Sequence, residues 1–472
     1  MTLHDAYHVK KTKIIATLGP SSWREDIIKR MMIEGVDGFR FNFSHADYEV
    51  FSRTTRLIRR LDSEERIPII GDLQGPVVRL GTFTPFPVRR GQKVVLVRGE
   101  KAEGEGEIPI PDSVVFDVLR EGDVVLVESG RLAFRVVERN DGRCVAEALV
   151  DGVVNPRKTF AIKGKDLPLN PLTEKDVRDV EFAVKQGFDA VALSFVKRAE
   201  DVQRLRELLY DLGAEDTRII AKIETRSAVK NLDSILREAD LVLVARGDLA
   251  IYYRLEEILG VQRYIVESAR RRGKPSIIAT QLLESMVNNP MPTRSEVVDV
   301  ITAVRMGADA LMLAGETAAG KYPIDAVAWL NRIIREAEKE GEEGEDLKPE
   351  NLYEEIAKGV VMLSKIIEGK IVAYSERGNT ARRLSKFRPS KNAYVFTSNP
   401  RTARYMSLLR GIAPVVAREL DRTRPDFFES LLEATMKREI AGVGDLVIFT
   451  AGRRRGATDV IRVEKIKPKL GG

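Results

Sequence analysis

Eight short apolar runs, separated by longer segments with helical pattern, constrain the fold of this chain most strongly. Continuous Ile, Leu and Val content of this kind is typical of parallel strands buried on both faces. The runs are TKIIATL, GFRFNF, IPIIGDL, DAVALSF, RIIAKIE, LVLVARG, PSIIAT and DALMLA. One intervening segment begins with Thr173 as a candidate N-cap and ends at Gly187. Eight strand–helix repeats over about 250 residues predict an α/β fold, a (β/α)8 TIM barrel.

Two segments differ from this pattern. Residues 80–158 contain short β-rich runs with Gly-Asp and Asn-Asp-Gly turns, which predict a small inserted β-barrel lid. From about residue 345, strand-like runs alternate with helical stretches again, which favours an open α/β domain. The predicted domains are the barrel (1–79 and 159–344), the β lid (80–158) and a C-terminal regulatory domain (345–472).

Charged residues stand where two of the predicted strands end. Lys222 and Glu224 close the fifth run, and Asp248 follows the sixth. Packing explains them poorly, because burying an ion without a partner is costly. A structural ion pair between Lys222 and Glu224 is the alternative interpretation. Two carboxylates suit a hard divalent cation and a lysine suits a neighbouring phosphate, so the pattern indicates phosphoryl transfer.

The barrel prediction brings these residues to one end of the molecule. Catalytic groups of such barrels lie on the loops that follow the strands. The polar residues at these positions are Arg40, Asn42, Ser44, His45, Asp72, Arg79, Lys222, Glu224, Asp248, Thr280 and Glu316. The strand register therefore predicts a single polar cleft.

Composition narrows the classes of function. The net charge is +6, but 77 basic residues are interleaved with 71 acidic ones, without a clustered patch or a nucleic-acid-binding module. No apolar stretch reaches the length of a membrane span, and the N-terminus lacks a signal-peptide core. The single Cys144 excludes an internal disulfide. We expect a cytoplasmic protein without nucleic-acid or membrane partners, and the abundance of Glu, Lys and Arg favours a heat-adapted source.

Two further motifs are weaker evidence of function. The segment GETAAGKY matches a Walker A loop except that Tyr322 replaces the magnesium-binding Ser or Thr and Pro323 follows. No Walker B strand accompanies it, so we do not predict a P-loop. His4 and His8 are four residues apart but lack a third ligand, and we expect them to be surface residues.

Ordered motifs along essentially the whole chain resemble those of pyruvate kinases. They are FRFNFSH, SFVKRAEDV, AKIE, ARGDL, TQLLESM, PTRSEVVDV and LMLAGETAAGKYP. The resemblance implies a glycolytic phosphotransferase that moves the phosphoryl group of phosphoenolpyruvate to ADP, giving pyruvate and ATP. It also implies a homotetramer and allosteric control.

The resemblance implies roles for the residues of the predicted cleft. Glu224 and Asp248 would hold Mg²⁺ or Mn²⁺, and Lys222 and Arg40 would contact the phosphoryl group. The remaining substrate-binding residues would be Gly247 and Asp248, through their backbone N–H groups, and Thr280, which would help protonate the enolate. The nucleotide-binding residues would be Arg79, Lys158, Asn42 and His45.

The monovalent cation site of the family is altered in this sequence. Its positions are Asn42, Ser44, Asp72 and Leu73, where Leu73 replaces a Thr. Gln74 stands where a Lys is usual, and Val77 stands where potassium-requiring members carry Glu. Since a hydroxyl ligand and a nearby negative charge are lost, we predict little or no activation by K⁺.

The third predicted domain resembles the effector-binding domain of the family. Small polar residues and exposed N–H groups at a helix start would form a phosphate site for a phosphorylated allosteric effector. The candidate residues are Ser375, Arg377, Gly378, Asn379, Thr380 and Arg454. A solvated basic loop is the alternative interpretation.

Two other functions are open on the sequence alone. A metal-dependent lyase or aldolase acting on a pyruvate enolate could use Glu224 and Asp248, but would need neither Lys222 nor a nucleotide-facing Arg79. A non-catalytic sensor of a phosphorylated metabolite could keep the fold without the chemistry. The combination of Lys222, both carboxylates and Thr280 favours the kinase.

Overall fold

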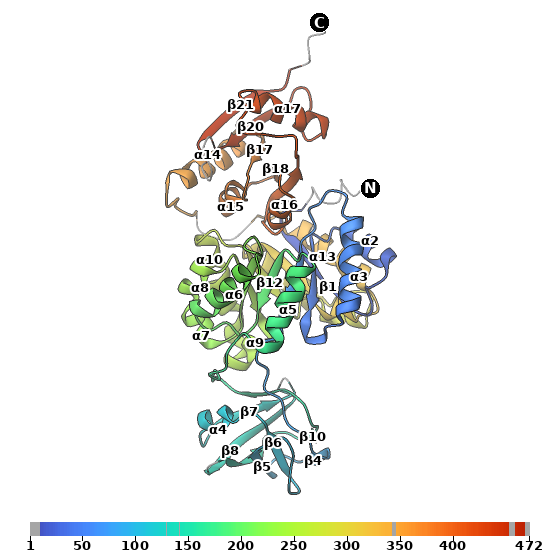
Figure 1. The fold of residues 1–472 in the computed structure, drawn as a ribbon, viewed down its shortest axis with the longest axis vertical. Helices are drawn as coiled ribbons and strands as arrows, with labels where there is room; N and C mark the ends of the chain where they lie inside the picture. Colours follow the sequence, from blue (N-terminus) through green and yellow to red (C-terminus); the bar gives the residue numbers. More distant parts are fainter. Residues whose placement is uncertain (1–9, 129, 141, 342–345, 453–457, 468–472) are drawn as a thin grey trace.

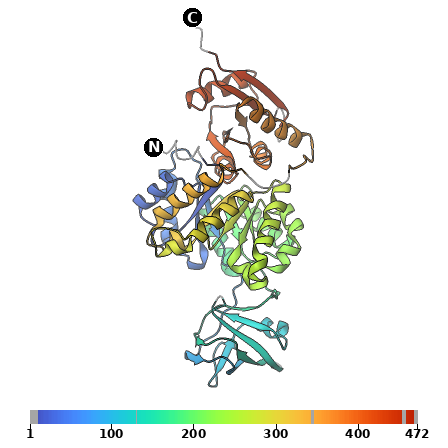
Figure 2. The same ribbon diagram turned by 180° about the vertical axis from the view of Figure 1, so that it is seen from behind.

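The computed structural model describes residues 10–128, 130–140, 142–341, 346–452 and 458–467. Two opposite side views show three parts in a row, with the barrel in the middle, the inserted lid at one end and the C-terminal part at the other (Figure 1, Figure 2). Three residues discussed above, His4, His8 and Arg454, lie outside the described residues. No helix in the described ranges is both long and apolar enough to cross a membrane.

All eight predicted strands form one closed parallel barrel, which confirms the fold prediction. The order around the barrel is β1-β16-β15-β14-β13-β12-β3-β2. The bounds are β1 (Lys13–Leu18), β2 (Gly38–Asn42), β3 (Ile69–Asp72), β12 (Ala190–Leu193), β13 (Arg218–Ile223), β14 (Leu241–Ala245), β15 (Ser276–Ala279) and β16 (Ala310–Leu313).

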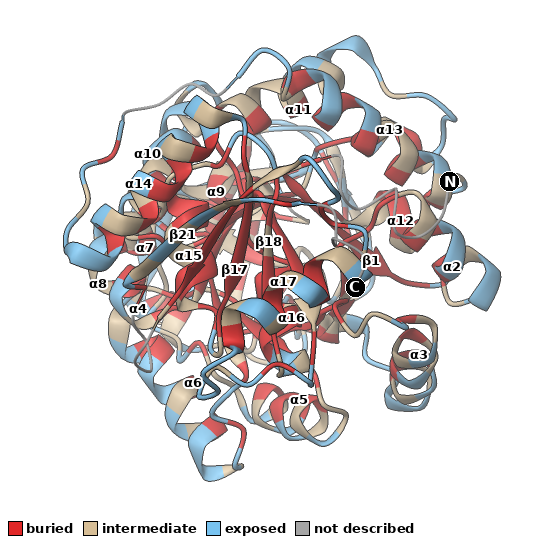
Figure 3. Ribbon diagram, turned by 90° about the horizontal axis from the view of Figure 1, so that it is seen from above, coloured by how far each residue is buried: buried red, intermediate tan, exposed pale blue. Residues whose placement is uncertain are grey.

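Burial on both faces explains why these runs lack polar alternation. Ile14 and Ala16 of β1 belong to the core between strands and helices, whereas Ile15 belongs to another core cluster with Ile70 and Leu243 from other strands. Viewed along the long axis of the molecule, buried strands lie at the centre of a ring of helices (Figure 3). The apolar runs therefore serve two packing layers at once.

Helices cover the barrel between its strands, and one of them begins at the predicted cap. Thr173 and Asp176 form a capping box at the start of α5, as the sequence predicts. The barrel helices are α2 (Glu25–Ile33), η1 (Phe43–His45), α3 (Tyr48–Leu61), α5 (Glu174–Lys185), α6 (Ala199–Asp211), α7 (Arg226–Lys230), α8 (Leu232–Glu238), α9 (Arg246–Tyr252), η2 (Leu255–Glu257), α10 (Ile258–Arg271), η3 (Glu284–Val287), α11 (Arg294–Arg305), α12 (Gly315–Ala318) and α13 (Pro323–Ala337).

The inserted segment is β-rich, as predicted, and follows β3. It contains a six-stranded sheet of order β11-β7-β8-β9-β5-β6, a two-stranded sheet β10-β4 and one helix. The two chain segments that join it to the barrel run side by side, since Leu80 N–H donates to the Lys158 carbonyl at 2.9 Å. The bounds are β4 (Phe86–Val88), β5 (Lys93–Arg98), β6 (Glu107–Ile110), α4 (Val114–Val118), β7 (Val124–Val127), β8 (Leu132–Asn140), β9 (Arg143–Ala148), β10 (Gly152–Val154) and β11 (Phe160–Ile162).

The C-terminal part is a five-stranded sheet of order β19-β18-β17-β20-β21, in which only β21 pairs antiparallel to its neighbour among the described strands. Its elements are α14 (Leu352–Ile367), β17 (Lys370–Tyr374), α15 (Asn379–Lys386), β18 (Ala393–Thr397), α16 (Pro400–Met406), β19 (Ile412–Val416), α17 (Phe427–Lys437), β20 (Leu446–Ala451) and β21 (Val460–Lys465).

Buried ion pairs attach this part to the starts of the barrel strands. Asp309, directly before β16, pairs with Arg388 at 2.6 Å, and Asp189, directly before β12, pairs with Arg404 at 2.6 Å. Lys13, at the start of β1, donates to the Ile412 carbonyl at 2.7 Å. The opposite barrel end, where the strands finish, therefore faces the lid.

Candidate active site

Lys222 lies in the middle of a charged cluster where the barrel strands finish. Its Nζ atom is 2.9 Å from Glu224 Oε1 and 3.3 Å from Asp72 Oδ1, and it donates to Ser194 Oγ at 2.8 Å. Burial alone would lower the pKa of Lys222, but the charges of Asp72, Glu224 and Asp248 outweigh it and raise this pKa. The ammonium group is therefore a permanent charge inside the protein.

Arg40 on β2 supplies a second cation beside it. Arg40 Nε donates to Asp72 Oδ2 at 2.7 Å, and its Nη1 donates to Thr17 Oγ1 at 3.0 Å. Burial would raise the pKa of Asp72, but Lys222 and Arg40 lower it below its usual value. Asp72 therefore stays ionised and holds both cations in place.

Glu224 and Asp248 form a carboxyl pair on the other side of Lys222. Glu224 Oε2 accepts the Phe195 N–H at 2.7 Å, and Asp248 lies close enough that each carboxyl group affects the pKa of the other. Burial, reinforced by Asp248 and opposed by Lys222, raises the pKa of Glu224 to about 7. Burial also raises the pKa of Asp248. The nearby positive charge is therefore too small to keep both carboxyl groups of the pair ionised at their usual pKa values.

This pair fits a divalent cation. Glu224 Oε1 is buried and, although it pairs with Lys222, has no well-formed hydrogen bond among the described residues. In the same ranges, no group of three or more His, Cys, Asp or Glu residues is arranged for a metal. Mg²⁺ typically takes one or two carboxylates and completes its shell with water and substrate oxygens, so two protein ligands suffice.

The loop after β15 holds Thr280 in an unusual backbone conformation. Thr280 and Gln281 have φ values of 69° and 53°, which are disfavoured for residues other than glycine. Arg246 donates to their carbonyls at 2.7 and 2.8 Å and pairs with Asp299 at 2.7 Å. Thr280 Oγ1 in turn accepts the Gly247 N–H at 3.1 Å, so these contacts fix its hydroxyl at the edge of the cluster.

Comparison with known proteins identifies the family. Residues 9–327 match the model for the pyruvate kinase barrel domain, and residues 354–464 match the model for the pyruvate kinase alpha/beta domain. The chain belongs to the pyruvate kinase family. Pyruvate kinases are phosphotransferases that use phosphoenolpyruvate and ADP, and they generally need a divalent metal.

Individual pyruvate kinases resemble the chain over most of its length. That of Agrobacterium vitis is 36% identical over 475 residues, covering 97% of this chain and 97% of that protein. That of Aeropyrum pernix is 38% identical, covering 86% and 88%. The crystal structure of pyruvate kinase from Pyrobaculum aerophilum matches with a TM-score of 0.86 at 34% identity, covering 97% and 99%. These comparisons support neither the lyase nor the sensor.

The residues expected to bind nucleotide lie farther out, at the junction with the lid. Arg79 donates to the Arg157 carbonyl at 3.2 Å, and Lys158 pairs with Glu128 at 3.0 Å. Within the described ranges, neither bonds to the Lys222 cluster. His45 is exposed at the end of η1.

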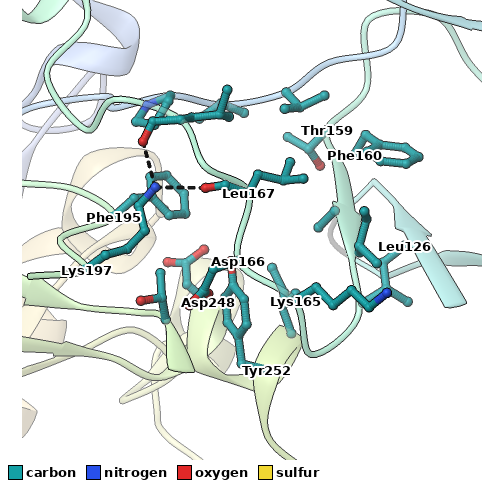
Figure 4. Close-up of a pocket in the computed structure, with 18 of the residues that line it drawn as sticks. Leu126, Thr159, Phe160, Lys165, Asp166, Leu167, Phe195, Lys197, Asp248 and Tyr252 are labelled. Atoms are coloured by element: carbon teal, nitrogen blue, oxygen red, sulfur yellow. Dashed lines mark hydrogen bonds between the residues drawn. The ribbon is translucent and has the colours of Figure 1, made fainter. Parts of the chain in front are cut away.

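A pocket of about 170 Å³ lies beside this junction, between lid and barrel. Figure 4 shows Asp248 and Tyr252 of α9 on one side of it and Leu126, Thr159 and Phe160 on the other. Lys197 bonds to the Leu167 and Leu169 carbonyls at 2.8 and 2.6 Å, which anchors the segment returning from the lid. The pocket therefore connects Asp248, one of the two carboxyl groups of the pair, with the lid.

The oxygens expected to hold a monovalent cation have protein partners. Asn42 Oδ1 accepts the Ser44 N–H at 3.1 Å, the Leu73 carbonyl accepts the Ser194 hydroxyl at 2.7 Å, and Asp72 pairs with Arg40. Much of their bonding capacity is used without a bound ion.

The expected effector loop is also partly bonded internally. Thr380 N–H donates to Ser375 Oγ at 3.2 Å, and the Thr380 and Thr458 hydroxyls are 2.9 Å apart. Gly378 has a φ of 83°, which the turn into α15 requires. Arg377 and Asn379 line a separate cavity against the barrel.

Sequence reasoning missed three residues that position the cluster. They are Ser194, Arg246 and Asp299. Ser194 directly follows β12, so the rule that selects polar residues at strand ends could have found it. Asp299 lies on α11 and carries no such signal.

Proposed function

We propose that the Lys222 cluster of this chain carries out phosphoryl transfer from phosphoenolpyruvate to ADP. The observation that carries the proposal is the Lys222 ammonium group, whose side chain is only 13% exposed and which lies 2.9 Å from Glu224, in a carboxyl pair suited to a divalent cation. Charge on the oxygens of the moving phosphoryl group is the main catalytic problem in such reactions. A fixed cation beside a metal site would stabilise that charge.

Lys222 and Arg40 would bind and orient the phosphoryl group. Both are anchored from behind, Lys222 by Ser194 and Arg40 by Thr17, and Asp72 pairs with both. This anchoring favours preorganised charge, because little side-chain rearrangement is needed when the reaction begins. Glu224 and Asp248 would hold Mg²⁺ or Mn²⁺, which supplies positive charge to the substrate oxygens when bound.

Thr280 and the start of α9 would bind the other end of the substrate. The N–H groups of Gly247 and Asp248 would receive the substrate carboxylate. In this structure the Gly247 N–H donates to Thr280 Oγ1. A carboxylate accepting from Gly247 would replace that hydroxyl, which would leave Thr280 free to deliver a proton to the enolate carbon.

The nucleotide would lie between the cluster and the lid. Arg79 and Lys158 at the junction would contact its phosphates, with Asn42 and His45 on the barrel side. Closure of the lid over the pocket beside Asp248 would exclude water, which competes with ADP for the phosphoryl group. The homotetramer, the allosteric effector, the heat-adapted source and the cytoplasmic location stay predictions from the resemblance and the composition.

The function is tested by mixing the protein with phosphoenolpyruvate, ADP and Mg²⁺ and measuring both products. We expect ATP and pyruvate in equal amounts, and no turnover when EDTA removes the metal. Pyruvate and inorganic phosphate without ATP would show transfer of the phosphoryl group to water instead of ADP, and the absence of all products would contradict the kinase and leave the lyase and the sensor.

Metal binding is expected to release protons in a pH-dependent way. Because the pKa of Glu224 is raised to about 7, roughly half of this carboxyl is protonated in the metal-free protein at pH 7. Calorimetric titration of Mg²⁺ in two buffers of different ionisation enthalpy measures the release. We expect more protons released at pH 6 than at pH 7, almost none at pH 8.5, and weaker Mg²⁺ binding as the pH falls. Proton release independent of pH would contradict the assignment.

We also propose that turnover needs no added potassium. The support is the internal bonding of Asn42 and Leu73, together with the uncharged Val77. With Na⁺ or K⁺ as the only monovalent cation, we expect turnover numbers equal within a factor of about two, since the loss of a hydroxyl ligand and of a nearby negative charge weakens ion binding. A large acceleration by K⁺ would overturn this prediction.

A further inference from the structure

A second polar cavity lies between the barrel and the C-terminal part. Its volume is about 390 Å³, within the range of small-molecule sites. Arg218 at the start of β13 and Arg237 on α8 line its barrel side, while Arg377 and Arg382 line it from the C-terminal part. The start of β13 is the barrel end remote from Lys222, and α15 lies against that end in Figure 1.

The lining of this interdomain cavity is strongly basic. Among the residues that the structure describes, two acidic ones line it, Asp240 and Glu350. The described part of the chain contributes six cationic side chains to its lining: Arg218, Arg237, Arg272, Lys274, Arg377 and Arg382.

Protein carboxylates leave much of this charge uncompensated. Arg382 donates to the carbonyls of Arg272 and Gly273, both at 3.4 Å, and Lys274 donates to the Ala239 carbonyl at 2.7 Å. In the described parts of the chain, Arg377, Arg382 and Lys274 have no carboxylate within ion-pair distance. Burial lowers the pKa of Lys274, and the nearby Arg382 lowers it further although Asp240 opposes both.

Asp240 already forms ion pairs with two arginines. It pairs with Arg206 at 3.1 Å and with Arg218 at 3.3 Å, and it also accepts the Ile219 N–H at 2.9 Å. Glu350 lies 3.6 Å from Lys386. Neither acid is free to neutralise the cations on the C-terminal side.

We propose that this interdomain cavity binds a small phosphorylated metabolite that lacks a nucleobase. Guanidinium groups bind phosphate oxygens in pairs of parallel hydrogen bonds, and several of them converge here from two parts of the chain. The excess of cations favours a phosphate dianion over a monocarboxylate.

The aromatic surface of the cavity argues against a nucleotide. Tyr405 supplies its aromatic ring, and the Arg218 guanidinium covers that ring at 4.4 Å from the centroid. Gly378 packs closely against the same ring, where an added Cβ would lie 2.9 Å from Cδ1. Little ring surface is left for a base to stack on, so the ligand is recognised by its charge.

This site shares Arg377 and Asn379 with the loop that the family resemblance indicates, but it faces the barrel instead of the hydroxyl groups of that loop. The Ser375 and Thr380 hydroxyls of that loop bond within the C-terminal part, whereas this site requires barrel residues. It also does not depend on the proposed catalytic function, because it lies at the other barrel end. A ligand here would join the two parts and stabilise their arrangement.

Calorimetric titration of glycerol 3-phosphate in the presence of EDTA tests the proposal. The barrel-side variant is Arg237→Gln/Arg272→Gln, whose shared partner Asp233 is 60% exposed and tolerates the loss. The C-terminal-side variant is Arg377→Gln. The matched control is Arg263→Gln, an exposed arginine of α10 outside the cavity. We expect Kd to rise about tenfold or more in both cavity variants, and to stay unchanged in the control.

Other outcomes would overturn the proposal. A Kd that is the same in all four proteins, or no binding to the wild type, would exclude the site. Loss of binding in Arg377→Gln alone would place the phosphate on the C-terminal loop. AMP binding about tenfold tighter than glycerol 3-phosphate would show that a base is recognised. Thermal melts of each variant, followed by circular dichroism, confirm that the proteins compared are folded.

Discussion

Replacing Lys222 with Met is expected to lower kcat for ATP formation by about 10³-fold or more, equivalent to about 4 kcal/mol. Methionine keeps the length and apolar stem of lysine but removes the charge that lies between Asp72 and Glu224. The effect should fall on kcat more than on KM, because the charge on the phosphoryl oxygens changes most during transfer. Steady-state kinetics with a coupled assay measure it.

The matched control is a second buried Lys–Glu pair away from the site. Lys386, whose side chain is 2% exposed, pairs with Glu354 at 2.8 Å in the C-terminal part. Lys386→Met should lower the melting temperature, since it leaves a buried carboxylate unpaired, but should change kcat little. If both variants lost activity equally, the effect of Lys222 would be structural, and its proposed role would be wrong.

Replacing Glu224 with Gln is expected to abolish stabilisation by Mg²⁺ and to lower kcat by about 10³-fold. The amide keeps the shape and an acceptor for the Phe195 N–H, but cannot supply a charged ligand beside Asp248. At Mg²⁺ concentrations of 100 times Kd, the wild type should gain about 2.7 kcal/mol in unfolding free energy, and the variant almost none.

Thermal melts with and without Mg²⁺ measure this difference. Glu354→Gln, which alters the matched pair with Lys386, should keep the full stabilisation by Mg²⁺. A Glu224→Gln protein that melts at a higher temperature in Mg²⁺, as the wild type does, would place the metal elsewhere.

The barrel and the centre of the site could be predicted because their signals are local. Each strand corresponds to one short apolar run, which can be recognised in the sequence without knowledge of distant residues. Parallel strands then place their carboxyl ends together. Lys222 and Glu224 are therefore near Asp248 by topology alone. Their individual contacts could not be predicted in this way.

Contacts that join distant segments carry no local signal. The sequence predicts Asp72 as a monovalent-cation ligand but gives no sign of its ion pairs with Arg40 and Lys222. The positive φ of Thr280 depends on Arg246, and the packing that sets it is invisible in the loop sequence. The interdomain cavity combines segments more than a hundred residues apart, and its arginines look like ordinary surface charge in the sequence.

The proposed site divides the catalytic work between Lys222, which would act on the phosphoryl group, and the Glu224–Asp248 pair, which would hold the metal. Exchange of the pyruvate methyl protons in D₂O, followed by NMR with Mg²⁺ and inorganic phosphate, needs the metal and a proton donor but no phosphoryl transfer. We therefore expect Lys222→Met to keep most of this exchange while losing ATP formation, and Glu224→Gln to lose both. Loss of proton exchange and ATP formation to the same extent in Lys222→Met would contradict the account.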